Sequence, residues 1–255
     1  MHFSVVIVCK NEAAIIGKTL TALQNFAPDI VVYDNGSTDA TIETVKQYPV
    51  NLVQGAWEGF GKTKNKANSY AKYDWILSLD ADEIPDDLLK QSLQKLLPEN
   101  EQQVFEIKFK NFFGTQWLRY GEWGRDKHIR IFNKRYVSWN EAPVHEQLVF
   151  PEDVIVQKLE GAVLHYTAEN LKEYEAKLMK YAALNGEKYF LQGKKTNFLK
   201  KYISAGFHFF QNYFLRLGVL DGVAGFKCAA MMVRYTFKKY EALERMKRGS
   251  VRSQA

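Results

Sequence analysis

The sequence predicts an α/β protein with a mostly parallel, doubly wound sheet, in a chain of 255 residues. Apolar strand patterns alternate with helical patterns through the first half of the chain, as in a parallel sheet. Polar and acidic residues follow several of these strand patterns, at the carboxyl ends where open α/β sheets bind ligands. Hydrophobic residues make up 46% of the chain, enough for a substantial core.

The first half of the chain supplies the parallel part of this sheet. Its strand patterns are nearly continuous apolar runs, as expected of strands buried on both faces. Apolar residues at helical spacing fill the intervals between them. The expected strands cover residues 3–9, 30–33, 51–53 and 75–79, and the clearest helices cover about 13–25 and 63–71.

The pattern changes at residue 104. Phe105, Ile107 and Phe109 alternate with charged residues, which indicates a half-buried strand and a small antiparallel region. After about residue 167 apolar residues recur at helical spacing to the end of the chain. We therefore expect a first domain over residues 1–166 and a helical C-terminal extension over residues 167–255.

Composition narrows the class of protein. The formal charge of +6 is compatible with nucleic acid, an anionic membrane or phosphorylated substrates, and does not choose among them. The two cysteines, Cys9 and Cys228, suggest neither a disulfide framework nor a zinc cluster. No glycine-rich dinucleotide motif or Walker loop follows the first strand. No secretory signal or apolar run of roughly 18 residues is visible, so we expect a cytoplasmic protein.

Carboxylates follow the apolar strand at residues 75–79. Asp80 and Asp82 lie two residues apart, so an extended backbone places them on the same side. Carboxylate oxygens of this kind suit Mg²⁺ or Mn²⁺, with substrate phosphates as further ligands. The alternative is an acidic turn before a helix, with Pro85 as the first helical residue and Asp86 in the first turn.

Polar side chains also follow two other strands, at the same edge of the expected sheet. Asn11 and Glu12 follow the first strand, and Asp34 follows the second. Because the carboxyl ends of parallel strands meet at one edge of a sheet, we expect these side chains to face Asp80 and Asp82. Randomly placed surface charges would not favour that edge.

Three motifs in these segments resemble family-2 glycosyltransferases of the Rossmann-like GT-A fold. They are the opening strand at residues 4–7 with Asn11 and Glu12, the segment Tyr-Asp-Asn-Gly-Ser-Thr-Asp-Ala-Thr at 33–41, and Leu-Asp-Ala-Asp-Glu at 79–83. The second has a tyrosine and an asparagine where aspartates often stand. Residues 59–65, 144–146 and 220–222 also resemble the lipopolysaccharide-core β-1,4-glucosyltransferases.

The resemblance implies metal-dependent, inverting transfer of a sugar from a nucleotide-diphosphate donor, with UDP-glucose as a candidate. The acceptor would be a lipopolysaccharide-core or other cell-surface glycan or glycolipid. By resemblance, Asn11, Glu12 and Asp34 would hold the base and ribose, and Asp39 would support that pocket. Asp80 would contact the ribose or the metal, and Asp82 would ligate the Mg²⁺ or Mn²⁺ that bridges the diphosphate.

Several further residues are candidates for the site. An inverting enzyme needs a general base for the acceptor hydroxyl, and Glu146 or Glu141 is the candidate. His145 would be a third metal ligand or, alternatively, a hydrogen-bonded core histidine. Lys62 and Lys64 would add positive charge near the phosphates or begin a solvated helix. Arg130 could clamp a phosphate, as could Arg125, but its alternation with Ile129 and Ile131 predicts an exposed strand position.

The C-terminal third raises the question of a membrane. Phenylalanines and tyrosines between residues 207 and 214 are mixed with lysines and arginines, as in an interfacial helix on anionic lipid. The alternative is a helical cap with a basic outer face. We expect peripheral contact with the inner face of the membrane and no nucleic-acid partner. The rival functions are a nucleotidyltransferase and a non-catalytic basic module that binds membrane or nucleic acid.

Overall fold

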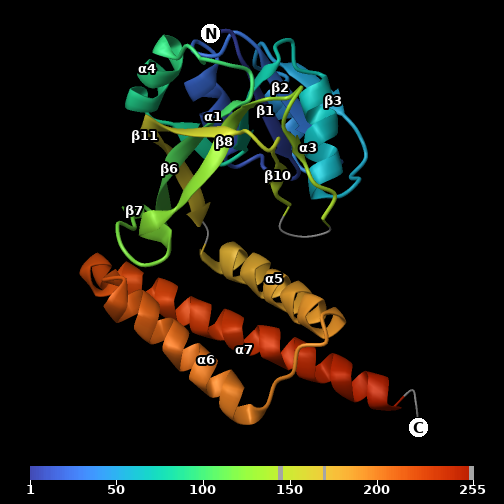
Figure 1. Ribbon diagram of the computed structural model, residues 1–255, viewed down its shortest axis with the longest axis vertical. Helices are drawn as coiled ribbons and strands as arrows, with labels where there is room; N and C mark the ends of the chain where they lie inside the picture. Colours follow the sequence, from blue (N-terminus) through green and yellow to red (C-terminus); the bar gives the residue numbers. More distant parts are fainter. Residues whose placement is uncertain (143–145, 169–170, 253–255) are drawn as a thin grey trace. The chain divides into compact units, whose positions relative to one another are not determined.

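The protein is described by a computed structural model over residues 1–142, 146–168 and 171–252, and the chain divides into two compact units (Figure 1). The first unit comprises residues 1–109 and 127–165, and the second comprises residues 110–126 and 166–255. The division after His165 lies one residue from the expected boundary. Residues 110–126, which we expected in the first domain, group with the second unit.

The main sheet has parallel strands on one side and antiparallel strands on the other. Its order is β3-β2-β1-β4-β8-β6-β11-β5, and β7 pairs with β6. The parallel strands are β1 (Ser4–Cys9), β2 (Ile30–Asp34), β3 (Asn51–Gln54) and β4 (Trp75–Asp80). The others are β5 (Glu83–Pro85), β6 (Gln103–Phe113), β7 (Gln116–Trp117), β8 (Lys127–Asn133) and β11 (Ile155–Ala168). A separate two-stranded sheet pairs β9 (Ser138–Trp139) with β10 (Leu148–Val149).

Side chains of β1 fill the core on both faces of the sheet. Val5 and Ile7 join one buried cluster, whereas Val6 joins the other, because successive residues of a strand point to opposite faces. This two-sided burial explains the continuous apolar run that predicted the strand. The helices of this unit are α1 (Ile16–Leu23), α2 (Thr41–Val45), α3 (Phe60–Ser69) and α4 (Asp87–Lys95).

Three helix starts differ from expectation. Helix α1 begins at Ile16 because hydrogen-bonded turns from Glu12 precede it. Helix α3 begins at Phe60 rather than near residue 63, directly after Gly59, whose φ of +97° a glycine adopts without strain. Pro85 is not the first residue of α4, because it pairs with β11 as part of β5. The Asp86 carboxylate caps that helix instead.

The second unit is mainly helical. It contains η1 (Trp123–Arg125), α5 (Leu171–Leu191), α6 (Phe198–Phe210), the π-helical turn η2 (Gln211–Leu215), η3 (Gly218–Asp221) and α7 (Gly222–Arg252). Helix α7 packs against both α5 and α6. At Gly186 a Cβ atom would lie 2.5 Å from the carbonyl oxygen of Lys239, so the absence of a side chain there lets α5 approach α7 closely. No helix in the described ranges is long and apolar enough to cross a membrane.

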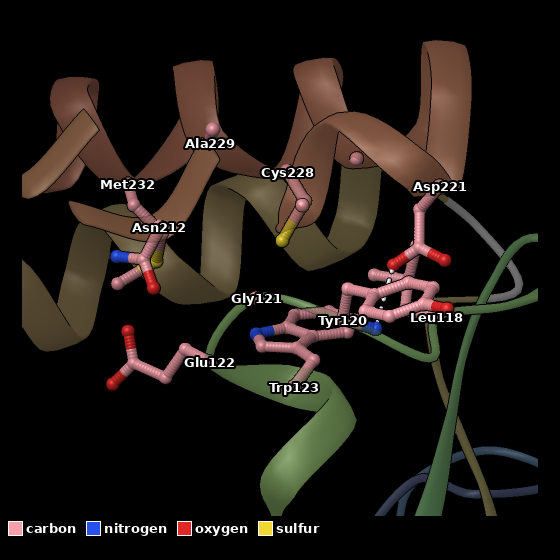
Figure 2. A pocket seen from close by; sticks show the side chains of 12 residues that line it. Leu118, Tyr120, Gly121, Glu122, Trp123, Asn212, Asp221, Cys228, Ala229 and Met232 are labelled. Atoms are coloured by element: carbon pink, nitrogen blue, oxygen red, sulfur yellow. Dashed lines mark hydrogen bonds between the residues drawn. The ribbon is translucent and has the colours of Figure 1, made fainter. Parts of the chain in front are cut away.

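Asp221 ties residues 110–126 to these helices. Its carboxylate accepts hydrogen bonds from the backbone N–H groups of Arg119 at 3.1 Å and Tyr120 at 2.9 Å. Figure 2 shows Asp221 beside a small cavity, together with Glu122 and Cys228. Burial raises the pKa of the Cys228 thiol to about 12, so it stays neutral at physiological pH. The cavity is therefore lined by the Asp221 carboxylate, which already accepts hydrogen bonds, and by the neutral thiol of Cys228.

Candidate active site

The carboxyl end of β4 carries a buried ion pair. The backbone N–H of Asp80 donates to Glu83 Oε2 at 2.9 Å, which closes the turn between β4 and β5. Arg130 reaches this turn from β8, with its Nη2 atom 2.5 Å from Glu83 Oε1 and 3.4 Å from Asp80 Oδ2. The guanidinium also lies over the ring of Phe109, 5.2 Å from its centroid.

The predicted exposure of Arg130 was wrong, since only 7% of the residue is accessible to solvent. β8 is buried continuously from Arg130 to Asn133, and the Arg130 side chain points toward the buried Glu83 carboxylate instead of solvent. Burial raises the pKa of Glu83 to about 7, while the Arg130 charge opposes that rise. A buried carboxylate with a fixed guanidinium holds the turn that presents Asp80 and Asp82.

His165 lies beside Asp82, a juxtaposition that we did not predict. β11 pairs antiparallel with β5, which sets His165 opposite Glu83, and its Nε2 atom lies 3.4 Å from Asp82 Oδ2. Burial lowers the pKa of His165, but the hydrogen bond and charge of Asp82, with the charges of Glu83 and Asp80, outweigh it and leave the pKa raised. The sequence shows His165 only as a residue in a late strand, and its role depends on which strand pairs with β5.

Lys64 connects two predicted site residues. From α3 its Nζ atom lies 2.9 Å from Glu146 Oε1 and 3.7 Å from Asp80 Oδ1. The same ammonium lies over the Trp139 ring, 4.5 Å from the centroid. Lys62 instead forms a separate, exposed ion pair with Glu141 at 3.2 Å. The structure therefore brings Glu146, but not Glu141, to the carboxylates that end β4.

The loops after β1 and β2 are held together by their own polar side chains. Asn11 adopts a left-handed conformation with φ of 57°, and its side-chain oxygen accepts from the backbone N–H of Thr38 at 2.7 Å. Asp34 is buried and accepts from the backbone N–H groups of Gly36 and Ser37, each at 3.0 Å. The carboxylate of Asp34 therefore shapes the loop from inside it.

Asp39 extends this network to the start of α1. It accepts from the backbone N–H of Ala13 at 3.2 Å and from Thr41, whose hydroxyl lowers the pKa of Asp39. The backbone N–H of Glu12 donates to the Thr41 hydroxyl at 2.8 Å. Within the described residues, the buried side-chain oxygen of Asn35 accepts no hydrogen bond. An unsatisfied buried acceptor is costly, so this oxygen is available for a ligand donor.

The donor atoms at β4 suit a divalent cation. Asp82 supplies carboxylate oxygen and His165 supplies imidazole nitrogen, both partly exposed to solvent. No three histidine, cysteine, aspartate or glutamate side chains of the described residues form a metal cage by themselves. Mg²⁺ is commonly held by one or two carboxylates with substrate phosphates, so the residues present fit such a cation. His145, the predicted third ligand, lies outside the described residues.

Comparisons with known proteins connect this geometry to a family. The sequence model for glycosyl transferase family 2 matches residues 4–148. The chain is 27% identical to the lipopolysaccharide core biosynthesis glycosyltransferase LpsC of Rhizobium meliloti, over 93% of this chain and 90% of LpsC. It is 25% identical to an uncharacterized glycosyltransferase of Rickettsia typhi, over 98% of this chain and 88% of that relative.

A solved structure is similar over nearly the full length. It is Staphylococcus aureus TarS 1–349, with a TM-score of 0.46, 18% identity, and coverage of 98% of this chain and 92% of that chain. The predicted family resemblance, α/β GT-A fold class and enzyme class are confirmed by the family match and the observed sheet. Because that match extends over more than half of the chain, the protein belongs to glycosyl transferase family 2, whose members transfer sugars from nucleotide-sugar donors.

Proposed function

We propose that this transferase moves a sugar, with inversion and with the help of Mg²⁺ or Mn²⁺, from a nucleoside-diphosphate sugar to a lipopolysaccharide-core or related cell-surface glycan. One observation carries the proposal. Asp80 ends β4, Asp82 follows it in the turn to β5, and each carboxylate lies within 4 Å of a basic side chain. Lys64 and Arg130 face Asp80, and His165 faces Asp82. A site that binds a metal and a diphosphate needs both kinds of charge at one place.

We assign the metal to Asp82 and His165. The bound cation would stabilise the negative charge that grows on the departing nucleoside diphosphate. The carboxylate of Asp82 raises the pKa of His165, so metal binding would displace any proton that the two side chains share. His145 stays a proposed further ligand.

We assign the nucleoside to the loops after β1 and β2. The exposed side chain of Asn11 and the partly buried side chain of Glu12 would contact the base and ribose. The buried Asp34 would hold the pocket in shape with Asp39. The unpartnered side-chain oxygen of Asn35 can accept an N–H group of a nucleobase. UDP-glucose is the candidate donor. The N–H group of its uracil base would donate a hydrogen bond to the Asn35 side-chain oxygen.

Glu146 is the better candidate for the general base. Its side chain is 15% exposed and is held by Lys64, which also faces Asp80, whereas the Glu141 side chain is 68% exposed. In the reaction the acceptor oxygen would bond to the anomeric carbon, the bond from that carbon to the diphosphate would break, and Glu146 would take the hydroxyl proton. Lys64 would orient the Glu146 carboxylate and add positive charge beside the diphosphate.

The name of one relative supports our proposal for the acceptor. LpsC, whose name places it in lipopolysaccharide core biosynthesis, is similar over 93% of this chain, which supports a core glycan or glycolipid as acceptor. Such an acceptor is met at a membrane, so we place the enzyme in the cytoplasm, in peripheral contact with the inner face of an anionic membrane.

A panel of nucleotide sugars tests this proposal, with melting temperature and donor hydrolysis measured with and without Mn²⁺ or Mg²⁺. We expect one donor to raise the melting temperature only when metal is present, and Asp82→Asn to abolish that effect. Glu146→Gln should keep donor binding and lose transfer to a core-glycan acceptor, while its matched control Glu141→Gln keeps both. Unchanged turnover in Asp82→Asn would contradict the metal site. If Glu141→Gln loses transfer and Glu146→Gln keeps it, the general base is Glu141 rather than Glu146.

A further inference from the structure

The outer side of α6 is an exposed apolar stripe. Leu199, Ile203, Phe207, Phe210 and Phe214 recur every three or four residues through α6 and η2, and all five are exposed. Ile203 and Phe207, in the middle of the stripe, are 59% and 58% exposed. Soluble surfaces seldom carry contiguous apolar side chains of this size unless something binds them.

The opposite side of α6 is fully used in packing. Ala205 is buried, Lys201 pairs with Glu244 of α7 at 3.7 Å, and His208 lies 3.3 Å from the hydroxyl of Thr236. The exposed stripe is therefore not a consequence of a loosely attached helix. Helix α6 is held against α7 by one side and presents phenylalanine, leucine and isoleucine on the other.

The turn from α6 to α7 continues the apolar surface. Its exposed side chains are large and aliphatic, although turns at a surface are usually polar. They are Leu215, Leu217, Val219 and Leu220, followed by Val223 in the first turn of α7. The turn is fixed in place because the buried Asp221 within it binds backbone N–H groups of residues 119 and 120. A rigid apolar turn cannot fold back to hide its side chains.

Aromatic rings join the stripe to the turn. Phe226 on α7 lies 5.8 Å from Tyr213 and 6.0 Å from Phe209, measured between ring centroids. Tyr213 in turn lies 5.1 Å from Phe214, and Phe214 lies 5.5 Å from Phe210. We call this continuous surface the apolar face: the α6 stripe, the turn side chains just named, and Phe226.

The segment of sequence that carries the apolar face is strongly basic. Between Glu187 and Glu241 the only acidic residue is Asp221, which is 6% exposed and bound to backbone N–H groups. Ten basic residues lie in the same interval: Lys188, Lys194, Lys195, Lys200, Lys201, Arg216, Lys227, Arg234, Lys238 and Lys239. Three of these basic residues pair with acidic side chains from other segments: Lys201 with Glu244, Arg216 with Glu122, and Arg234 with Glu175. Exposed lysines such as Lys200 and Lys227 remain, so a partner that covers the apolar face meets a surplus of positive charge.

We propose that the apolar face docks on an anionic lipid bilayer, with Phe207, Ile203 and the turn side chains in the headgroup and upper acyl region. An interfacial helix of this kind combines an apolar face with lysines and arginines beside it. Each lysine or arginine near an anionic surface adds about 1 kcal/mol of attraction, or about fivefold in binding. A second copy of the chain would set two positive surfaces against each other, so the bilayer is the occupant that the charge favours.

This inference deepens the membrane contact of the proposed function and rests on it, and its test needs neither donor nor acceptor. The full chain is sedimented with vesicles of equal parts phosphatidylglycerol and phosphatidylcholine, and with vesicles of phosphatidylcholine alone. We expect binding to the anionic vesicles that weakens as salt is raised. Ile203→Ser with Phe207→Ser should reduce the binding about tenfold or more. Lys200→Glu with Lys227→Glu should also reduce it, because both positions are exposed.

Matched controls separate this face from general stickiness and charge. Leu88→Ser with Leu97→Ser removes two exposed leucines of the first unit and should leave vesicle binding unchanged. Lys46→Glu reverses an exposed charge of that unit and should also have little effect. Light scattering after size-exclusion chromatography reports whether the chain forms a dimer. Equal vesicle binding by the Ile203/Phe207 variant, or a dimer that this variant dissociates, would overturn the proposal. Metal-dependent donor hydrolysis measured in the same samples tests the proposed function separately.

Discussion

Replacing Arg130 by methionine tests the buried ion pair at the end of β4. Arg130 is 7% exposed and its guanidinium lies 2.5 Å from the buried Glu83 carboxylate. Methionine has a similar length but no charge, so Arg130→Met leaves Glu83 buried without its principal counter-ion. Breaking a buried pair from one side costs about 3–5 kcal/mol of unfolding free energy, mostly from the charge left behind.

The loss should depend on pH. Burial already raises the pKa of Glu83 from 4.5 to about 7, and loss of the opposing Arg130 charge raises it further. A carboxyl with a raised pKa in the folded state contributes stability below its unfolded pKa and loses that stability as pH rises through its folded pKa. Arg130→Met should therefore be destabilised less at about pH 5 than at about pH 8.

Hydrogen exchange of peptides that cover β4 and β8 measures this stability in the first unit alone. Arg135→Met is the matched control, because Arg135 pairs with Asp74 at 3.0 Å but its side chain is 63% exposed. A surface pair of that kind contributes about 1 kcal/mol or less. Adding Glu83→Gln to Arg130→Met should recover most of the loss at high pH. A cost equal to that of the Arg135 control, or equal at both pH values, would refute the reasoning.

Three further changes test the fold around both units. Gly161→Ala should destabilise the first unit severely, because φ is +91° and the new Cβ would lie 2.1 Å from the backbone nitrogen of Leu89; thermal unfolding and solubility measure it. Asp86→Ala removes an acceptor of N–H groups from Leu89 and from β11, and should cost about 1–2 kcal/mol in urea unfolding. His208 lowers the pKa of Glu122, so Glu122→Gln should weaken protection of α6 at neutral pH and converge with the parent as pH falls through that lowered pKa. Faster exchange of Glu122→Gln at low pH only would contradict this assignment.

The parallel half of the fold could be predicted because its inner strands β1, β2 and β4 bury both of their faces, whereas β3 is a partly exposed edge strand. Val5, Val6 and Ile7 all face apolar neighbours, so the run of apolar letters identifies the strand directly. The antiparallel part was less accessible, since β5 has only three residues and reads as the approach to a helix. Residues 110–126, which we expected in the first domain, group with the second unit, and their anchor Asp221 lies about a hundred positions later.

The candidate site divides in the same way, into residues that a local sequence pattern identifies and residues whose position depends on distant parts of the chain. Asp80 and Asp82 could be named as candidates because they directly follow a strand that local pattern defines, and Glu146 could be chosen as a candidate by residue type. The preference for Glu146 over Glu141 depends on Lys64, which joins residues from α3, β4 and a later loop. His165 could not be found, because no local signal states that β11 pairs with β5. Arg130 was misjudged because an alternating pattern does not show what a polar side chain meets on its own side of the sheet.

The way the chain crosses between its two units has a consequence for truncation. The chain passes from one unit to the other within β6, after Asp126 and within β11, so no single cut separates the two. A fragment that stopped after His165 would keep residues 110–126 but lose the Asp221 carboxylate that receives two of their N–H groups. Expressing, deleting or exchanging either unit by itself would remove part of a strand that the two units share. Any variation in the helical part must therefore be accommodated within an intact, full-length chain.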